Sequence, residues 1–350
     1  MRVLEFGNNK AAAYCGRLFQ FYGAEVIRVD LPTNIAYQET SLSLEQGSLD
    51  IYLHTDKKRI SINYLLEQGR QLLQELAASV DIVVTDHLPA ELDALVWTEF
   101  EAGLKVSITP FGLSGPYRNW RGFSPILLAM GGYTQLSGDE DREPLSLPGH
   151  YIEYQSGQYA YTAALAAHCF DNKNKNIEVS MLETVLSLSQ FTSVMWNCVQ
   201  QIRARHGNRF GNIHPITLYP CKDGFVYVNV VPAFWANFVS MLEREDLLED
   251  ERFKDNEARC EHYAELDEIV SRIFAEYTME ELIEKGQRSN RLPIGKLMSL
   301  QQVLEDQHLQ ARCFWRDIIL PEGKVKMPGS PFRERPLNVQ EQGTWSPANV

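Results

Sequence analysis

The 350-residue sequence has no hydrophobic run near the roughly 18 consecutive apolar residues that a membrane-spanning helix needs. No G-x-G-x-x-G follows a strand-like segment and no G-x-x-x-x-G-K-[ST] occurs, so dinucleotide binding and P-loop chemistry have no support. The six cysteines lie far apart, without a C-x-x-C pair or a histidine at zinc-finger spacing. We therefore expect no metal site, no disulfide framework and a cytoplasmic location, which the lack of a signal-peptide pattern in MRVLEFGNN also favours.

Positive charge is also scarce. Lys and Arg together number 33 against 46 Asp and Glu, which gives a formal net charge of −13. This balance disfavours binding to duplex nucleic acid and to anionic lipid, so we expect neither a nucleic-acid partner nor a membrane partner. Hydrophobic residues make up 44% of the chain and charged residues 23%, as in ordinary soluble proteins. An anionic small ligand would need a local basic pocket.

The first half of the chain alternates strand-like and helix-like segments. Residues 2–6 read as a strand, and residues 11–22 carry apolar side chains at helical spacing until Gly23. The same rhythm predicts further strands at 25–29, 59–64, 82–84 and 105–109, and a further helix at 67–79. A repeated β-α-β pattern predicts an α/β fold with a parallel sheet and covering helices, which is a Rossmann-like half.

The second half of the chain has a different sequence pattern, and the chain is long enough for two domains. A loop rich in Asp, Glu, Pro and Gly spans 138–149, and helices are predicted at 156–169 and 181–201. The Asp223–Gly224 turn between alternating apolar residues predicts a β-hairpin. A helical stretch from 233 to about 285 reads as part of a small second domain.

Nine segments carry a family resemblance that no single one of them would support. F-G-x-[ST]-G-P-Y or K-D-G-[FY] alone also reads as a turn between strands, but the segments occur in one order from end to end. They are CGRLFQFYGAEVIRVDLP (15–32), DKKRISIN (56–63), VSITPFGLSGPYRNWRGF (106–123), GHYIEYQSGQYAYTAALAA (149–167), VSMLETVLSL (179–188), RHGNRFGNIHP (205–215), YPCKDGFVYV (219–228), DERFKDNEARCEH (250–262) and MPGSPFRERP (327–336). In these segments the sequence resembles the class III CoA-transferases, the family of formyl-CoA transferase, crotonobetaine/carnitine CoA-transferase and alpha-methylacyl-CoA racemase.

The resemblance implies a Rossmann-like large domain and a small α+β domain. Residues 1–215 and the C-terminal return 301–350 would form the large domain, and residues 216–300 the small one. Family members form dimers whose chains are threaded through each other, so the resemblance also implies an interlocked homodimer. The extended linkers around 138–149 and 205–215 would then be ordered by the partner chain.

The chemistry of this family depends on one carboxylate, an Asp four residues before a Gly at the start of a small-residue helix. In this sequence the position is Glu153, with Gly157 four residues on. The resemblance implies that Glu153 attacks an acyl-CoA thioester to form a mixed anhydride, that the thiolate returns to form a glutamyl-CoA thioester, and that an acceptor acid takes the CoA. The extra methylene of Glu moves the carboxylate by about 1 Å, which costs roughly 10²-fold where attack geometry is strict. The alternative is an ordinary acid in the first turn of a helix.

Two other positions depart from the family pattern. The racemase branch has His and Asp where this chain has Phe123 and Ser124, so the acid/base pair that exchanges an alpha proton is absent and racemisation is disfavoured. The segment that usually contains Asn-Phe-Arg-Pro-Gly reads DHLPA at 86–90, with Leu88 in place of an Arg expected near CoA.

Other cations compensate for that loss. Lys57, Lys58 and Arg59 stand where the family has a basic pair before a strand, and Arg28 ends the second strand. The resemblance implies that they bind CoA phosphates, which Arg can hold bidentately. The alternative is a solvated strand start. Arg121 matches a Lys of formyl-CoA transferase and would face the acyl group or its carboxylate; the alternative is a surface charge.

The glycine pair Gly131 and Gly132 is implied to lie close to the active site. There the missing side chains would let the thioester approach backbone N–H groups that stabilise a developing oxyanion. The alternative is the commoner use of Gly, a positive φ in a tight turn.

These inferences together predict a CoA-transferase that takes acyl-CoA and carboxylic acid substrates, with coenzyme A as the carried group and no metal. Two alternatives stay open. The chain could be a non-catalytic subunit that forms a heterodimer with an Asp-bearing paralogue. It could also be a CoA-thioester isomerase or another non-transferring enzyme that reuses the same pocket.

Overall fold

A parallel sheet forms the centre of the larger of two layered bodies. The computed structural model describes residues 1–32, 44–170, 175–320 and 323–332. Within them, six strands pair in parallel in the order β3-β2-β1-β4-β5-β6. The order reverses between β1 and β4, where open α/β sheets usually bind ligands. The strands are β1 Arg2–Phe6, β2 Glu25–Asp30, β3 Lys58–Ser61, β4 Ile82–Thr85, β5 Leu104–Thr109 and β6 Lys175–Ser180.

Helices cover both faces of this sheet, as the sequence predicted. Successive side chains of a strand point to opposite faces. Val3 therefore packs in one core with α1, α6, α7 and α8, whereas Leu4 packs in another with α4 and α5. The helices of this body are α1 Lys10–Phe21, α3 Leu44–His54, α4 Glu67–Ala78, α5 Pro89–Ala94, α6 Ser124–Met130, α7 Tyr151–Cys169 and α8 Met181–Leu188, with the 3₁₀ turns Trp97–Glu99 and Thr134–Leu136.

The smaller body has a three-stranded antiparallel sheet in the order β7-β8-β9. The hairpin predicted at Asp223–Gly224 is confirmed, because Cys221 of β7 lies opposite Gly224 of β8. Val226 and Val228 of β8 pack with Phe238 and Leu266 in a core separate from those of the larger body. Its elements are β7 Ile216–Cys221, β8 Gly224–Asn229, α10 Trp235–Leu242, α11 Asn256–Glu261, α12 Tyr263–Phe274, α13 Met279–Ile283 and β9 Ile294–Lys296, with helical turns at Pro232–Phe234, Glu245–Leu248 and Glu284–Ser289.

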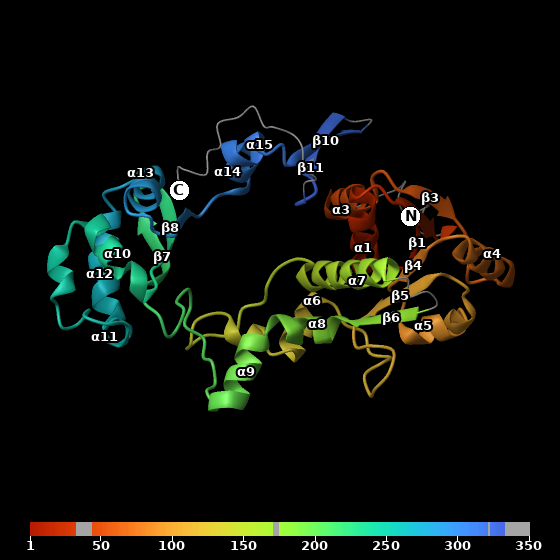
Figure 1. Ribbon diagram of the computed structural model, residues 1–350, viewed down its shortest axis with the longest axis horizontal. Coiled ribbons are helices and arrows are strands. Elements are labelled where there is room, and N and C mark those ends of the chain that lie inside the picture. Colours follow the sequence, from red (N-terminus) through yellow and green to blue (C-terminus); the bar gives the residue numbers. More distant parts are fainter. Residues whose placement is uncertain (33–43, 171–174, 321–322, 333–350) are drawn as a thin grey trace.

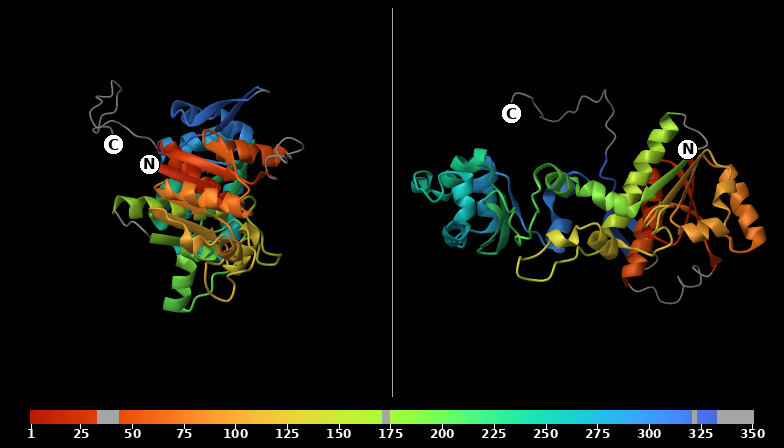
Figure 2. Two further views of the ribbon diagram at one scale, coloured as in Figure 1. Left: turned by 90° about the vertical axis from the view of Figure 1, so that its right-hand side faces the viewer. Right: turned by 90° about the horizontal axis from the view of Figure 1, so that it is seen from below.

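The two bodies lie at opposite ends of an elongated molecule (Figure 2), and the chain crosses between them twice. After the smaller body it forms α14 Leu300–Glu305, α15 Gln307–Ala311 and the hairpin of β10 Trp315–Leu320 and β11 Gly323–Pro328. This hairpin lies beside α3 of the larger body (Figure 1), where Arg316 forms a 3.0 Å ion pair with Asp56. Residues 333–350 of the predicted C-terminal return lie outside the described residues.

The two linkers predicted to be extended are bound to each other within one chain. The guanidinium of Arg205 donates to three backbone carbonyls of the first linker, those of Asp139, Glu140 and Arg142, and to that of Gln135 just before it, at 3.0–3.3 Å. The Gly207 N–H donates to the Gly138 carbonyl at 2.9 Å. Their ordering by a partner chain stays a prediction.

Two predicted helices have different limits in the structure. The helix predicted at 156–169 begins five residues earlier, at Tyr151, so Glu153 lies in its first turn. The single helix predicted over 181–201 is wrong: α8 ends at Leu188, and α9 Gln190–Val199 follows after Ser189. The Ser189 hydroxyl donates to the Val185 and Leu186 carbonyls and so competes with continuation of the helix. Among the described residues, no helix is both long and apolar enough to span a membrane.

Candidate active site

The edge of the sheet between β1 and β4 is occupied by a carboxylate of the protein itself. Asp86 follows β4 and is buried. Its Oδ1 accepts the N–H groups of Asn8 and Asn9 at 3.0 and 3.1 Å, and its Oδ2 accepts that of Ala12 at 2.9 Å. Gly7 permits this approach, because a Cβ there would lie 2.1 Å from Asp86 Oδ1. Burial raises the pKa of the Asp86 carboxyl, and the backbone donors oppose that rise.

This arrangement gives a physical reason for the missing glycine-rich motif. In doubly wound nucleotide-binding folds, the N-terminal N–H groups of the first helix hold the pyrophosphate. In this chain Asp86 takes those donors at the start of α1. A dinucleotide phosphate therefore cannot bind there, in agreement with the sequence.

Glu153 lies in the first turn of α7 with its carboxylate turned into the protein. Only 1% of the residue is exposed. The Ser124 N–H donates to its Oε1 at 2.9 Å, and the Ser124 hydroxyl donates to its Oε2. One residue at the start of α6 thus holds both oxygens of the predicted nucleophile. The site prediction itself stays a prediction, because carboxylate burial is compatible with a structural role.

The orientation of the Ser124 hydroxyl is fixed by a third bond. Its Oγ accepts the N–H of Ile152 at 2.9 Å. A hydroxyl donates one proton and accepts through its oxygen lone pairs. The Ile152 N–H takes one lone pair of Ser124 Oγ, so the hydroxyl proton points at Glu153. Sequence reasoning noted Ser124 only as the place of a missing Asp. The Ser-Pro pair at 124–125 was the available signal, because Pro is favoured in the first turn of a helix, where backbone N–H groups are free.

Gly157 sets the position of the Glu153 turn. A Cβ at Gly157 would lie 2.6 Å from the carbonyl oxygen of Ala11 and 3.2 Å from the N atom of Cys15, both in α1. The missing side chain therefore lets α7 pack directly on the backbone of α1. The Gly four residues after the predicted nucleophile has a packing reason in this fold.

Arg28 and Lys57, two of the cations predicted to bind CoA, are buried and paired. Arg28 donates to Glu5 at 3.0 Å and to Asp30 at 2.9 Å, and Lys57 donates to Glu5 at 2.6 Å. Burial alone would lower the pKa of the Arg28 guanidinium, but the Glu5 and Asp30 carboxylates raise it. Burial lowers the pKa of Lys57 to about 8, although Glu5 opposes this shift. Both cations hold the strands and α1 together in this structure.

Lys58 and Arg59, the other two predicted cations, are more accessible. The Lys58 side chain is 70% exposed and pairs with Glu25 at 2.7 Å. Arg59 bridges Asp30 and Asp50 at 2.8 and 3.0 Å. Their binding of CoA phosphates stays a prediction, and in this structure they are the members of the group that solvent reaches.

Arg121 and the glycine pair flank α6 at opposite ends. Arg121 is exposed three residues before Ser124. Gly131 ends the helix against Val185, where a Cβ would lie 2.4 Å from Cγ1, and Gly132 has a φ of +77°. A seven-residue helix is about 10 Å long, so Gly131 and Gly132 lie at the far end from the Glu153 carboxylate.

Leu88, where the resemblance implied an Arg, directly precedes α5 and donates its N–H to Glu91 at 2.8 Å. The Glu91 carboxylate also contacts Nδ1 of the neighbouring His87 ring at 3.1 Å. The His87 ring contacts the Tyr64 hydroxyl at 3.1 Å through its second nitrogen. This turn therefore binds its own side chains instead of presenting an Arg.

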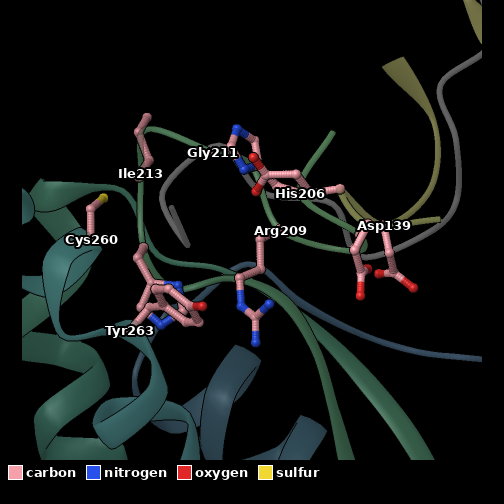
Figure 3. A pocket seen from close by; sticks show the side chains of 11 residues that line it. Asp139, His206, Arg209, Gly211, Ile213, Cys260 and Tyr263 are labelled. Atoms are coloured by element: carbon pink, nitrogen blue, oxygen red, sulfur yellow. The ribbon is translucent and has the colours of Figure 1, made fainter. Parts of the chain in front are cut away.

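A cavity of about 520 Å³ lies between the two linkers and α11–α12 (Figure 3), with Arg209 between Asp139 on one side and Tyr263 on the other. Asp267 holds the nearby side chains together. It accepts from Arg209 at 2.8 Å and from the Tyr219 hydroxyl at 2.6 Å. None of the site residues predicted from the sequence lines this cavity. In the described part of the chain, no three His, Cys, Asp or Glu side chains are grouped as metal ligands would be.

A model of CoA-transferase family III matches residues 1–348. The chain belongs to CoA-transferase family III. It is 30% identical over 342 residues to succinyl-CoA–D-citramalate CoA-transferase of Chloroflexus aurantiacus, covering 93% of this chain and 85% of that protein. It is 24% identical over 329 residues to the beta subunit of succinyl-CoA–L-malate CoA-transferase of the same organism, covering 89% and 81%.

The fold of this family III chain is also shared with a solved structure. A CaiB/BaiF family protein from Brucella suis superimposes with a TM-score of 0.81 at 23% identity, over 95% of this chain and 91% of that one. The predicted family and the predicted enzyme class are therefore confirmed: the chain is a CoA-transferase that works on CoA thioesters and acids.

Proposed function

We propose that this CoA-transferase carries CoA through Glu153. The supporting observation is that the carboxylate is buried and that both of its oxygens are held by Ser124. Two fixed donors restrict the carboxylate to one orientation, and fixed orientation is a large part of the advantage of an enzymatic nucleophile. An acid that only capped α7 would have no need of donors from α6.

The reaction proceeds by acyl exchange at that carboxylate. A Glu153 oxygen attacks the thioester carbonyl of the acyl-CoA, the C–S bond breaks, and CoA thiolate leaves. The thiolate attacks Glu153 Cδ in the resulting anhydride, and the donor acid leaves as a carboxylate. The acceptor carboxylate attacks Cδ of the glutamyl-CoA thioester and expels the thiolate, which takes the acceptor acyl group and regenerates Glu153. No net proton is gained or lost.

The 1% exposure of Glu153 sets a condition on this mechanism. A thioester carbonyl has to reach within about 3–3.5 Å of the attacking oxygen. The side chains that cover the carboxylate must therefore move when acyl-CoA binds.

We propose dicarboxylic acids as the substrate class, with succinyl-CoA as a donor. The relatives named for succinyl-CoA transfer to D-citramalate and to L-malate support this choice. A dicarboxylate leaves one carboxylate free after acylation, and exposed Arg121, near the start of α6, is suited to bind it. Lys58 and Arg59 supply accessible donors for CoA phosphates, while buried Arg28 and Lys57 support the strands that carry them.

A second candidate is a non-catalytic subunit that completes a hetero-oligomer with an Asp-bearing paralogue. The inaccessibility of Glu153 favours it, because acyl-CoA cannot reach the carboxylate unless the side chains that cover it move. The relative named as a beta subunit gives this candidate additional weight.

We further propose a Rossmann-like large domain of residues 1–215 with the return 301–350, a small domain of residues 216–300, and an interlocked homodimer. The strand order of the six-stranded sheet, the separate core of the smaller body and the Arg316–Asp56 contact support the domain limits. The elongated molecule, with linkers crossing between its two ends, supports the threaded dimer. Light scattering that gives a compact monomer would contradict it.

The test is intact-mass spectrometry after incubation with succinyl-CoA, with and without hydroxylamine. We expect a glutamyl-CoA adduct that hydroxylamine converts to a hydroxamate on Glu153. Glu153→Gln should abolish both, together with transfer to D-citramalate or L-malate, because an amide cannot act as the nucleophile. Glu183→Gln is the matched control, since Glu183 is an exposed acid in the first turn of α8.

The outcomes separate the candidates. Full activity of Glu153→Gln would remove Glu153 from the chemistry. A wild-type protein that forms no adduct alone, but supports transfer when mixed with an Asp-bearing paralogue, would establish the non-catalytic subunit.

A further inference from the structure

The same carbon of Glu153 is attacked twice in the proposed cycle, once by thiolate and once by the acceptor. Each attack on Cδ places negative charge on the oxygen that Glu153 retains. In the resting structure that oxygen already faces a donor, the Ser124 N–H or the Ser124 hydroxyl. We propose that Ser124 is a catalytic residue whose N–H and O–H form the oxyanion hole for the glutamyl intermediates, an inference that rests on the proposed role of Glu153.

Each oxygen of the Glu153 carboxylate has a donor of its own. The N–H is bonded to Oε1 and the hydroxyl to Oε2. Whichever oxygen becomes the bridge of the anhydride, the other remains a carbonyl with a Ser124 donor on it. Thiolate attack on Cδ forms the C–S bond, shifts the carbonyl electron pair to this oxygen, and then expels the donor acid. Acceptor attack on the thioester follows the same course, and the thiolate leaves.

The environment makes these donors effective. Ser124 and Glu153 are each 1% exposed, so their interaction is not weakened by solvent. The hydroxyl proton is directed by the Ile152 N–H, and the backbone N–H is fixed at the start of α6. The donors therefore need no rearrangement when charge develops.

The glycine pair predicted for an oxyanion role is less suitable for this step. Gly131 and Gly132 lie at the other end of α6, about 10 Å from Ser124. Their N–H groups also have carbonyl partners, in Leu127 at 2.8 Å and in Ala129 at 3.2 Å. Ser124 is the residue in direct contact with the carboxyl oxygens.

The experiment measures the breakdown of the glutamyl-CoA thioester in a single turnover. The adduct is formed with succinyl-CoA, freed of excess reagent, and mixed with hydroxylamine, and its decay is followed by intact-mass spectrometry. Ser124→Ala removes the hydroxyl and should slow the decay by about 10²-fold, as loss of one oxyanion-hole donor does. Ser124→Thr keeps the hydroxyl, so its thioester should decay at least tenfold faster than that of Ser124→Ala.

Ser156→Ala is the matched control. Ser156 is buried on α7 three residues after Glu153, and its Oγ has no hydrogen-bond partner among the described residues. Removal of this hydroxyl should leave the decay rate unchanged. Because only folded protein carries the adduct, a purely structural effect of Ser124→Ala would lower the amount of adduct and leave its decay rate at the wild-type value.

Each result decides the proposal. If Ser124→Ala forms too little thioester to isolate, accumulation of a succinyl anhydride on the protein supports the proposal, because thiolate attack on Cδ is then the slowed step. A decay rate within threefold of wild type overturns the role of the Ser124 hydroxyl in the oxyanion hole and leaves the proposed function standing. Failure of the wild type to form any adduct overturns both.

Discussion

The close packing of α7 on α1 can be tested at Gly157. A Cβ added there lies 2.6 Å from the Ala11 carbonyl oxygen, whereas ordinary contact begins near 3.4 Å, so Gly157→Ala must push the helices apart by about 0.8 Å. Both groups are backbone and cannot rotate away. Overpacking of this kind costs about 2–3 kcal/mol, and the better helix propensity of Ala returns about 1 kcal/mol. We expect a net loss of about 1–2 kcal/mol in the free energy of unfolding.

The same displacement should affect catalysis more than stability. A shift of about 0.8 Å in α7 moves the Glu153 carboxylate away from both Ser124 donors. A misplacement of this size can cost about 10²-fold in rate. The measured quantity is succinyl-CoA-dependent transfer by the folded variant, under conditions where far-UV circular dichroism shows native helix content.

Urea unfolding followed by circular dichroism measures the stability change, with Gly295→Ala as the control. A Cβ at Gly295 in β9 meets no atom within 4 Å, so this variant should stay within about 0.5 kcal/mol of wild type. The close approach of the two helices would be refuted if Gly157→Ala were as stable as the wild type, or more stable by the gain in helix propensity.

Three further outcomes are expected. Arg28→Ala should destabilise the protein by about 3–5 kcal/mol in urea unfolding, because it leaves Glu5 in a buried network with one cation fewer. Burial raises the pKa of the Asp267 carboxyl, but its hydrogen bonds to neighbouring side chains outweigh this effect and lower the pKa overall. The charged carboxylate therefore stabilises the fold above about pH 3.9, the usual pKa of an Asp, and this stabilisation is lost as the pH falls through the pKa of the folded state. Asp267→Asn should make the free energy of unfolding depend less on pH in this acid range. Glu153→Asp should lose roughly 10²-fold in transfer, because a shorter side chain withdraws the carboxylate from Ser124.

Each of these outcomes has a control and a contrary result. Lys58→Ala removes an exposed cation and should change stability by less than about 1 kcal/mol, so equal losses at Arg28 and Lys58 would contradict the buried network. Glu251→Gln alters an exposed acid and should leave the pH dependence of stability at acid pH as in the wild type, whereas Asp267→Asn should weaken it. Unchanged or higher transfer by Glu153→Asp would mean that the pocket retains the geometry of the family Asp.

Much of the sheet was predictable because its signals are local. The alternation of short apolar runs with helical spacing predicted the parallel strands, and the Asp223–Gly224 turn predicted the β7–β8 hairpin. The break between α8 and α9 was missed because Ser189 acts through its hydroxyl bonds to the preceding turn, in a segment whose apolar spacing reads as continuous helix.

The site was less predictable because its contacts join distant segments. Glu153 was identified from a family resemblance, but its donor Ser124 is 29 residues away and lies on another helix. The cations Arg28 and Lys57 were predicted to bind CoA phosphates, but in the structure both are bonded to Glu5, which lies 23 and 52 residues away in sequence. No local pattern reports that these charges meet inside the protein.

The carboxylate of Asp86 at the start of α1 has a consequence for selectivity. Because this anion is part of the chain, its effective concentration at the helix N-terminus does not depend on the amount of any free ligand. The helix N-terminus at this edge of the parallel sheet is therefore occupied by the chain itself. Any nucleotide portion that the protein binds must be recognised by side chains elsewhere, and discrimination against ordinary dinucleotides is built into the covalent chain.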